Sequence, residues 1–217
     1  MKRFIRKSSG AARPFGRDEN GSTMIEYAVV LPLFLLLLLG IVDFGRYGFD
    51  YIMTKKAMER GTRVIAVRNP VCPGVPNTHN RAPAQSGVTP PAFGTSCSVA
   101  GICENPGTIS CSLNATDGGA GQEIWARISA VMPSTVIAED VTVTYAYNSS
   151  LGFLGGPYVP EVTVELTGAQ FEFVTPLGGL ATLATGIANP GVPEGLVPFP
   201  SISVTMPGED LALGNNG

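Results

Sequence analysis

The fold of this chain is decided by one stretch, STMIEYAVVLPLFLLLLLGIV, which occupies residues 22–42. None of the sixteen residues from Tyr27 to Val42 is charged, and most are aliphatic. A helix needs roughly 20 apolar residues to cross the hydrocarbon core of a bilayer. We therefore expect residues 22–42 to form a membrane-spanning helix. Pro32 lies inside it, and a membrane helix tolerates proline because neighbouring groups or a local kink satisfy the freed carbonyl.

The charges on the two sides of this stretch differ strongly. Residues 1–21 contain six basic residues and two acidic ones, whereas residues 69–217 contain two basic residues and eleven acidic ones. Such a division favours two compartments, and a basic flank next to an apolar run points to membrane orientation and not to nucleic-acid binding. We expect residues 1–21 to be a cytoplasmic leader. Four bases beyond the apolar run, Arg46, Lys55, Lys56 and Arg60, compete with the six in the leader.

A cleaved secretory signal is one alternative for the same residues, because it also joins a basic flank to an apolar core. The flank would be about 26 residues long, and the sequence DFGRYGFDY after Val42 offers no small-x-small cleavage site. The pattern favours a retained helix.

The helical pattern continues past the apolar run. Apolar or small residues recur at steps of three and four, at Tyr47, Tyr51, Thr54, Met58, Gly61 and Ile65. This spacing predicts an amphipathic extension over residues 43–68, which ends before Pro70 because proline disfavours a helical residue before it. One helix from Ser22 to about Val67 would be about 70 Å long at 1.5 Å per residue. Its outer half needs another element to cover its apolar stripe.

A carboxylate at the start of the spanning helix is the first candidate site. Glu26 stands five residues after Gly21, at the threshold of the apolar run. A charge in hydrocarbon costs several kcal/mol, so an ionisable residue there indicates a function and calls for a cation at matching depth. If the chain is cut between Gly21 and Ser22, the new amino terminus of a neighbouring subunit supplies that cation. A plain interfacial carboxylate on a signal anchor is the alternative.

The block RDENGSTMIEYAVVLPLFLLLLLGIVDFGR, residues 17–46, resembles a known family. The Gly21/Ser22 junction, Glu26, Tyr27 and the aliphatic run resemble the processing signature of class III prepilins. The block through Asp43-Phe44-Gly45-Arg46 resembles TadE-like proteins, the minor pilins or pseudopilins of bacterial tight-adherence (Flp pilus) secretion systems.

This resemblance implies several partners and a location. A prepilin peptidase would cleave after Gly21 on the cytoplasmic face, and Glu26 would serve processing or assembly. Other pilin or pseudopilin subunits, an inner-membrane assembly platform and the lipid bilayer would be the partners. The chain would cross the bacterial inner membrane once, with its C-terminal region periplasmic or extracellular, and could enter a pilus.

All four cysteines lie in a segment that is rich in proline and glycine, residues 69–121: Cys72, Cys97, Cys103 and Cys111. We predict a long loop there with little regular structure. An even cysteine count in an exported loop predicts two disulfides, and four cysteines allow three pairings. The shortest loops that leave no thiol over favour Cys72 with Cys97 and Cys103 with Cys111.

A metal site made of three cysteines and His79 is a weaker alternative, because no Cys-x-x-Cys motif occurs. We expect His79 to be a solvated loop residue, with no metal and no cofactor. The sequence also lacks a Ser/His/Asp set, a phosphate-binding glycine loop and a paired-carboxylate motif. It favours a protein that is not an enzyme.

Residues 122–217 predict a helix plus antiparallel strands. Ile124, Ile128 and Val131 share a helical face over residues 122–131. Alternating apolar residues then predict strands around residues 141–147, 162–166 and 202–206. Phe171 and Phe173 have the opposite parity to the preceding strand, so we expect a bulge or break at Gly168-Ala169.

The predicted fold class is α+β: a long N-terminal helix whose outer half packs on a small antiparallel sheet. The favoured function is a pilin-like structural subunit of a tight-adherence type IV pilus, inserted by its helix after leader cleavage. The alternative is an uncleaved membrane anchor that displays a binding module or adhesin. Cleavage at Gly21/Ser22 separates the two.

Overall fold

A computed structural model describes residues 22–84, 86–87, 89–116, 119–175, 196–209 and 211 of the chain. It divides into two compact units, residues 1–42 and residues 43–217. The leader, including Gly21, lies outside the described residues.

Helix α1 runs from Ser22 to Ala66 and includes Pro32. In the first unit every side chain from Thr23 to Leu39 is exposed. Most of these side chains are aliphatic, so the surface of the helix is apolar here. Among the described residues this helix is long and apolar enough to cross a membrane. Exposed apolar side chains are unfavourable in water, so the helix requires lipid or apolar partners.

The second unit is built on a four-stranded antiparallel sheet with the order β1-β2-β3-β6. The strands are β1 (Thr108–Ser112), β2 (Val141–Ala146), β3 (Glu161–Leu166) and β6 (Ile202–Pro207). The last three lie where the alternating pattern predicts them. The α+β prediction, a long apolar helix followed by a small antiparallel sheet, is confirmed.

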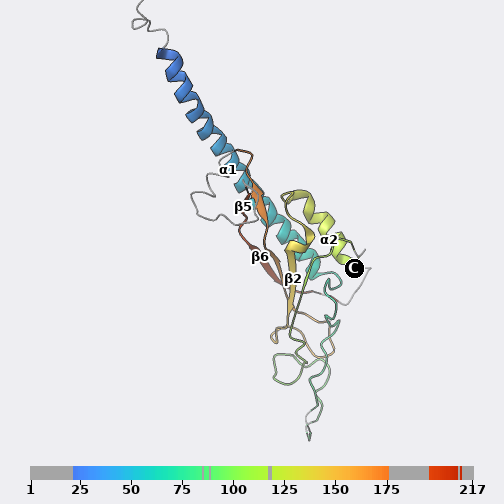
Figure 1. The fold of residues 1–217 in the computed structure, drawn as a ribbon. Helices are drawn as coiled ribbons and strands as arrows, with labels where there is room; N and C mark the ends of the chain where they lie inside the picture. The colour runs from blue at the N-terminus through green and yellow to red at the C-terminus, as the bar shows by residue number, and fades with distance from the viewer. Residues whose placement is uncertain are drawn as a thin grey trace, which may run out of the picture. The chain divides into compact units, whose positions relative to one another are not determined.

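One face of this sheet packs on the outer half of α1 (Figure 1). Alternate residues of β2 and β3 are buried, as a period of two requires. They share a core with Met58 and Ile65 of the helix, and both of these side chains are 0% exposed. The predicted stripe is the buried or half-buried side of this part of α1, so the sheet provides the cover that the stripe needs.

Gly168 separates the main sheet from a smaller one. Its backbone has φ of +78°, which lies in the left-handed region that favours glycine. Beyond it, β4 (Gln170–Glu172) pairs only with β5 (Leu196–Pro198) among the described strands. Phe171 and Phe173 are both buried. The predicted break at Gly168-Ala169 is confirmed, and it turns both aromatic rings toward the core.

The helical segment before β2 covers the predicted residues 122–131, but its last three residues form a 3-10 turn. Helix α2 spans Ala120–Ile128, and 3-10 turns follow at Ser129–Val131 and Ala138–Asp140. The predicted apolar face is correct for Ile124 and Ile128, which are buried. It is wrong for Val131, which is 37% exposed because it lies in the 3-10 turn, where the residues per turn differ from those of an α-helix. The expectation of an irregular loop over residues 69–121 is wrong at β1. This edge strand has no fully buried residue, so its sequence carries little apolar alternation.

Candidate functional site

The candidate processing site lies at the start of α1. Gly21 is outside the described residues, Ser22 is the first helical residue, and Glu26 and Tyr27 follow within the next two turns. Glu26 and Tyr27 are exposed. The helix therefore presents the Glu26 side chain on its surface, at the beginning of its apolar run.

A second acidic residue, Asp43, is the first residue of the second unit and is buried, with 2% exposure. Its Oδ2 atom accepts hydrogen bonds from the backbone N–H of Thr175 at 2.9 Å and from the Thr175 hydroxyl. Arg46 Nη1 lies 3.4 Å from its Oδ1 atom. Burial alone would raise the pKa of Asp43, but these hydrogen bonds and the Arg46 charge lower it overall.

Aromatic rings make further contacts between the outer half of α1 and the segments around β4 and β5. Tyr47 contacts Phe171 edge to face, with 5.2 Å between ring centroids, and contacts Phe199 at 5.7 Å. Phe44 meets Phe173 at 5.7 Å. The Arg46 guanidinium lies 5.7 Å from the centre of the Phe171 ring. The Asp43-Phe44-Gly45-Arg46 block thus holds the β4 segment against the helix. The sequence hinted at this role only by placing an aspartate directly after the apolar run.

The two disulfides join Cys72 to Cys111 and Cys97 to Cys103. The predicted pairing is therefore wrong, although the prediction of two disulfides agrees with the structure. The reason is the sheet. The N–H of Val71 donates to the Tyr145 hydroxyl at 3.1 Å, which brings the chain after α1 back to β2. Cys111 of β1 is opposite Val143 of β2. Cys72 therefore lies beside Cys111 and bonds to it, and not to Cys97, the next cysteine in the sequence.

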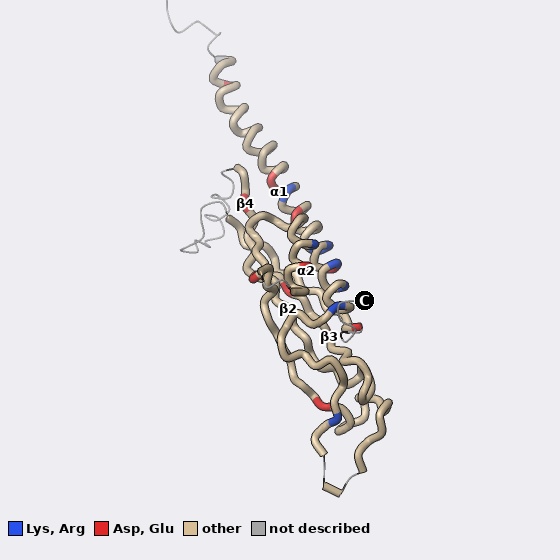
Figure 2. The backbone as a smooth tube through the Cα atoms, turned by 90° about the vertical axis from the view of Figure 1, so that its right-hand side faces the viewer, with Lys and Arg blue, Asp and Glu red and all other residues tan. Residues whose placement is uncertain are grey.

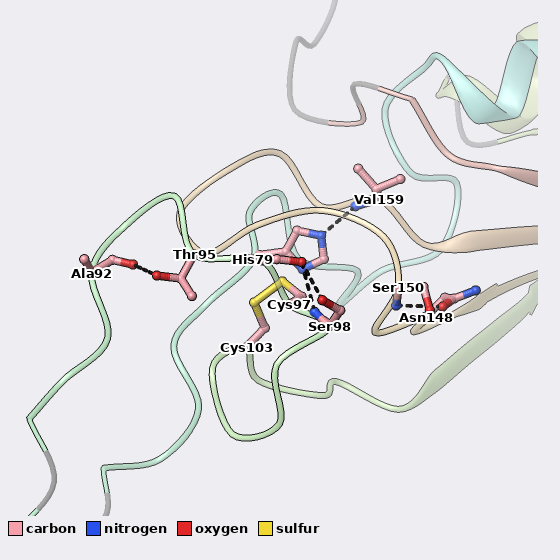
Figure 3. Close-up of a disulfide and its surroundings, with 10 residues drawn as sticks. His79, Ala92, Thr95, Cys97, Ser98, Cys103, Asn148, Ser150 and Val159 are labelled. Atoms are coloured by element: carbon pink, nitrogen blue, oxygen red, sulfur yellow. Dashed lines mark hydrogen bonds between the residues drawn. A yellow bond between two sulfur atoms is a disulfide. The ribbon is translucent and has the colours of Figure 1, made fainter.

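The second disulfide lies among loops beyond the sheet (Figure 3). These loops are joined by isolated bridges between Thr78 and Pro157 and between Ser96 and Phe153. Cys97 and Cys103 form a small core of their own with Leu154, which is 1% exposed. We call residues 77–106 and 148–159 the distal loops. A disulfide suits them because their own apolar core is small.

His79 anchors the distal loops, and the expectation that it is solvated is wrong. Its side chain is only 2% exposed. Its Nε2 atom accepts the N–H of Val159 at 3.2 Å (Figure 3). Its backbone also exchanges hydrogen bonds with Gly155 and Gly156. Burial lowers the pKa of His79, so the imidazole is held neutral as an acceptor.

The imidazole also lies beside the second disulfide. One of its ring nitrogens and the sulfur atoms of Cys97 and Cys103 lie within 4.8 Å of one another. The two sulfur atoms are bonded to each other, so neither is a thiolate able to bind a metal. The Nδ1 atom has no hydrogen-bond partner among the described residues. His79 lies in a loop, where burial follows no regular spacing along the sequence, so the sequence does not indicate that it is buried.

A protein-family model matches the N-terminal part of the chain. The family model described as TadE-like protein matches residues 21–63, which begin at Gly21 and cover most of α1. No curated protein and no solved structure shows a significant match to the chain. The matched segment includes Glu26, Tyr27 and the Asp43 to Arg46 block, and it supports a pilin-like protein associated with a tight-adherence pilus. Over residues 21–63 the chain is therefore similar to TadE-like proteins, which confirms the resemblance seen in the sequence.

Proposed function

We propose that this chain is a pilin-like structural subunit, a minor pilin or pseudopilin, in assembly of a tight-adherence type IV pilus. A prepilin peptidase removes residues 1–21, and the subunit then joins the assembly through its N-terminal helix. One observation carries the proposal: the TadE-like match starts at Gly21, the residue after which cleavage would occur, and continues through Glu26 along α1. The role is structural and requires no cofactor.

The charges and the disulfides support one orientation. Six bases in residues 1–21 favour a cytoplasmic leader. Both disulfides lie in the second unit, and disulfides persist in oxidising compartments outside the cytoplasm. We therefore place the N-terminus in the bacterial cytoplasm, the helix in the inner membrane and the second unit in the periplasm or beyond.

Glu26 has two roles in this proposal. Before cleavage the peptidase reads it together with Tyr27. After cleavage its carboxylate pairs with the new α-amino group at Ser22 of a neighbouring subunit. A single carboxylate in hydrocarbon is unfavourable by several kcal/mol, so pairing with a cation at the same depth favours one axial register between neighbouring helices.

The test is Glu26→Gln, which keeps the shape of the side chain and removes its charge. We expect the second unit to fold and oxidise normally while leader cleavage or piliation fails. Leu36→Ile, inside the same helix, leaves the charge pattern unchanged and should behave like the wild type. Leader cleavage is read by immunoblot and intact mass, and piliation by electron microscopy. Wild-type cleavage and wild-type pili in Glu26→Gln cells would remove the proposal's main support.

A second candidate is an uncleaved anchor that displays a binding module. The distal loops favour it, because Phe93 is 75% exposed and Phe153 is 49% exposed on a part of the unit that a disulfide stabilises. Exposed aromatic side chains on loops are common in binding surfaces. A membrane-extracted protein that begins at Met1 in cells containing the peptidase would favour this candidate over the first.

A further inference from the structure

A groove lies between the outer half of α1 and α2, in the second unit. Its volume is about 400 Å³, within the usual range for binding cavities of roughly 300–1,000 Å³. Val64 of α1 and Ile124 and Ile128 of α2 line its apolar part. Three arginines also line it: Arg60, Arg63 and Arg127. Figure 2 shows basic residues, in blue, along this part of α1 next to α2. An apolar groove edged by cations suits an apolar group that carries negative charge beside it.

The arginines are not equally available. Arg127 is paired with Glu123 at 2.5 Å, and Arg68 lies 3.8 Å from the same carboxylate. Arg60 and Arg63 are exposed, and no ion pair joins either of them to a described residue within 4 Å. The edge of the groove therefore keeps positive charge that an incoming carboxylate can neutralise.

The same chain carries a surface of the complementary kind. Residues 69–217 contain eleven acidic and two basic residues. Ile137 is 55% exposed, and Glu139 and Asp140 follow it in a 3-10 turn. Asp140 Oδ2 accepts the N–H of Ile137 at 3.0 Å, which holds the apolar side chain and the carboxylates on one short turn. Among the exposed large apolar residues described in this unit, Ile137 alone has two acids within three positions.

We propose that the groove between α1 and α2 binds the Ile137–Asp140 turn of a second copy of this chain. Ile137 enters the apolar part, and Glu139 lies against Arg60 and Arg63. The groove and the turn are different surfaces, so the contact is heterologous. Each copy keeps one free groove and one free turn, and the contact can repeat along an array or close into a ring. This inference builds on the proposed function, because a pilus subunit acts beside other subunits.

Charge reversal on full-length protein tests the contact. Two copies with different tags are expressed together, and co-purification from membranes in a non-ionic detergent is measured. Like charges placed opposite each other are strongly unfavourable, so Arg63→Glu and Glu139→Arg should each lower co-purification by about tenfold. The double variant Arg63→Glu/Glu139→Arg restores opposite charges and should recover most of the wild-type value.

The controls use exposed charges outside the groove and the turn. Lys55 is exposed on the same helix, and Glu161 is exposed at the start of β3. Lys55→Glu and Glu161→Arg should both leave co-purification unchanged. Thiol labelling checks that both disulfides are intact in each variant. Absence of co-purification for the wild type overturns the inference. So does insensitivity to both reversals, failure of the double variant to recover, or a different protein or lipid held by the groove in place of the second copy.

These outcomes are separate from those for the proposed function. One result is that leader cleavage and piliation depend on Glu26 while co-purification of the two copies does not depend on Arg63 or Glu139. This result would overturn the groove contact and leave the proposed function standing. The opposite result is that the copies associate through the groove while the leader stays uncleaved. This result would overturn the proposed function and leave the groove contact standing.

Discussion

The two disulfides should differ in how much they stabilise the second unit. Cys72 and Cys111 are separated by 39 residues, whereas Cys97 and Cys103 are separated by 6. A disulfide stabilises mainly by restricting the unfolded chain, and the effect grows with the length of the closed loop. The perturbation is a pair of double variants, Cys72→Ala/Cys111→Ala and Cys97→Ala/Cys103→Ala, which leave no unpaired thiol.

The chain-entropy relation gives the magnitudes. For loops of these lengths it predicts about 4 kcal/mol for the first disulfide and about 2 kcal/mol for the second. Loss of buried atoms adds a cavity contribution in both variants, because Cys72 is 3% exposed in the main core and Cys97 is 3% exposed in the core of the distal loops. The expected difference of about 2 kcal/mol therefore comes from loop length.

The assay is urea unfolding of the full chain in detergent, followed through the fluorescence of its single tryptophan, Trp125. Trp125 lies on α2 and packs against the main core, so it reports on the part of the unit that Cys72 and Cys111 hold together. Peptide mapping without reductant confirms the pairing first. A larger loss of stability on removal of Cys97 and Cys103, or a mapped bond between Cys72 and Cys97, would refute the reasoning.

Three further predictions concern single positions. Gly152→Ala should destabilise the distal loops by about 1–3 kcal/mol, seen as proteolysis there, because its φ is +79° and a Cβ would lie 2.1 Å from His79 Nε2. Asp43→Asn should cost about 1.5–3 kcal/mol in urea unfolding, because the amide replaces a charged acceptor of Thr175. The Asp43 contribution is present above about pH 4 and should disappear as pH falls through its lowered pKa. The imidazole of His79 should titrate in NMR spectra below its ordinary pKa of about 6.5, and protonation should remove the Val159 hydrogen bond. The histidine contribution to stability is therefore present above about pH 6.5 and lost as pH falls toward the lowered pKa.

The sequence predicted the elements whose side chains follow a period. Alternation in β2 and β3 and the stripe at Met58 and Ile65 on α1 indicate which residues are buried, and these residues form the main core. The parity change before Phe171 also predicted the break at Gly168. In each case burial on one face imposes a regular spacing that a reader of the sequence can detect.

The features that the sequence missed depend on contacts between distant segments. Cys72 meets Cys111 because β1 pairs with β2, and loop length alone gives no information about strand pairing. His79 is buried because the chain returns to it at Gly155 and Gly156. The role of Asp43 depends on Thr175, which is 132 residues away. None of these contacts has a local pattern, so only the assembled structure shows them.

The extent of the family match has a physical explanation in the helix. Up to Val42 the side chains must suit an apolar environment, and from Asp43 they must fit the sheet, so α1 meets two sets of requirements in one continuous element. The match ends at Arg63, close to the end of α1, and β1 to β6 lie outside it. A sheet can cover the stripe of α1 with many sequences, provided that its inner face is apolar and the helix end is secured. Here the end is secured by Cys72 with Cys111 and by the N–H of Glu209, which donates to the carbonyl of Ala66 at 2.6 Å. The match therefore covers most of α1, and the groove beside α2 combines Arg60 and Arg63 from within the match with residues of α2 that lie outside it.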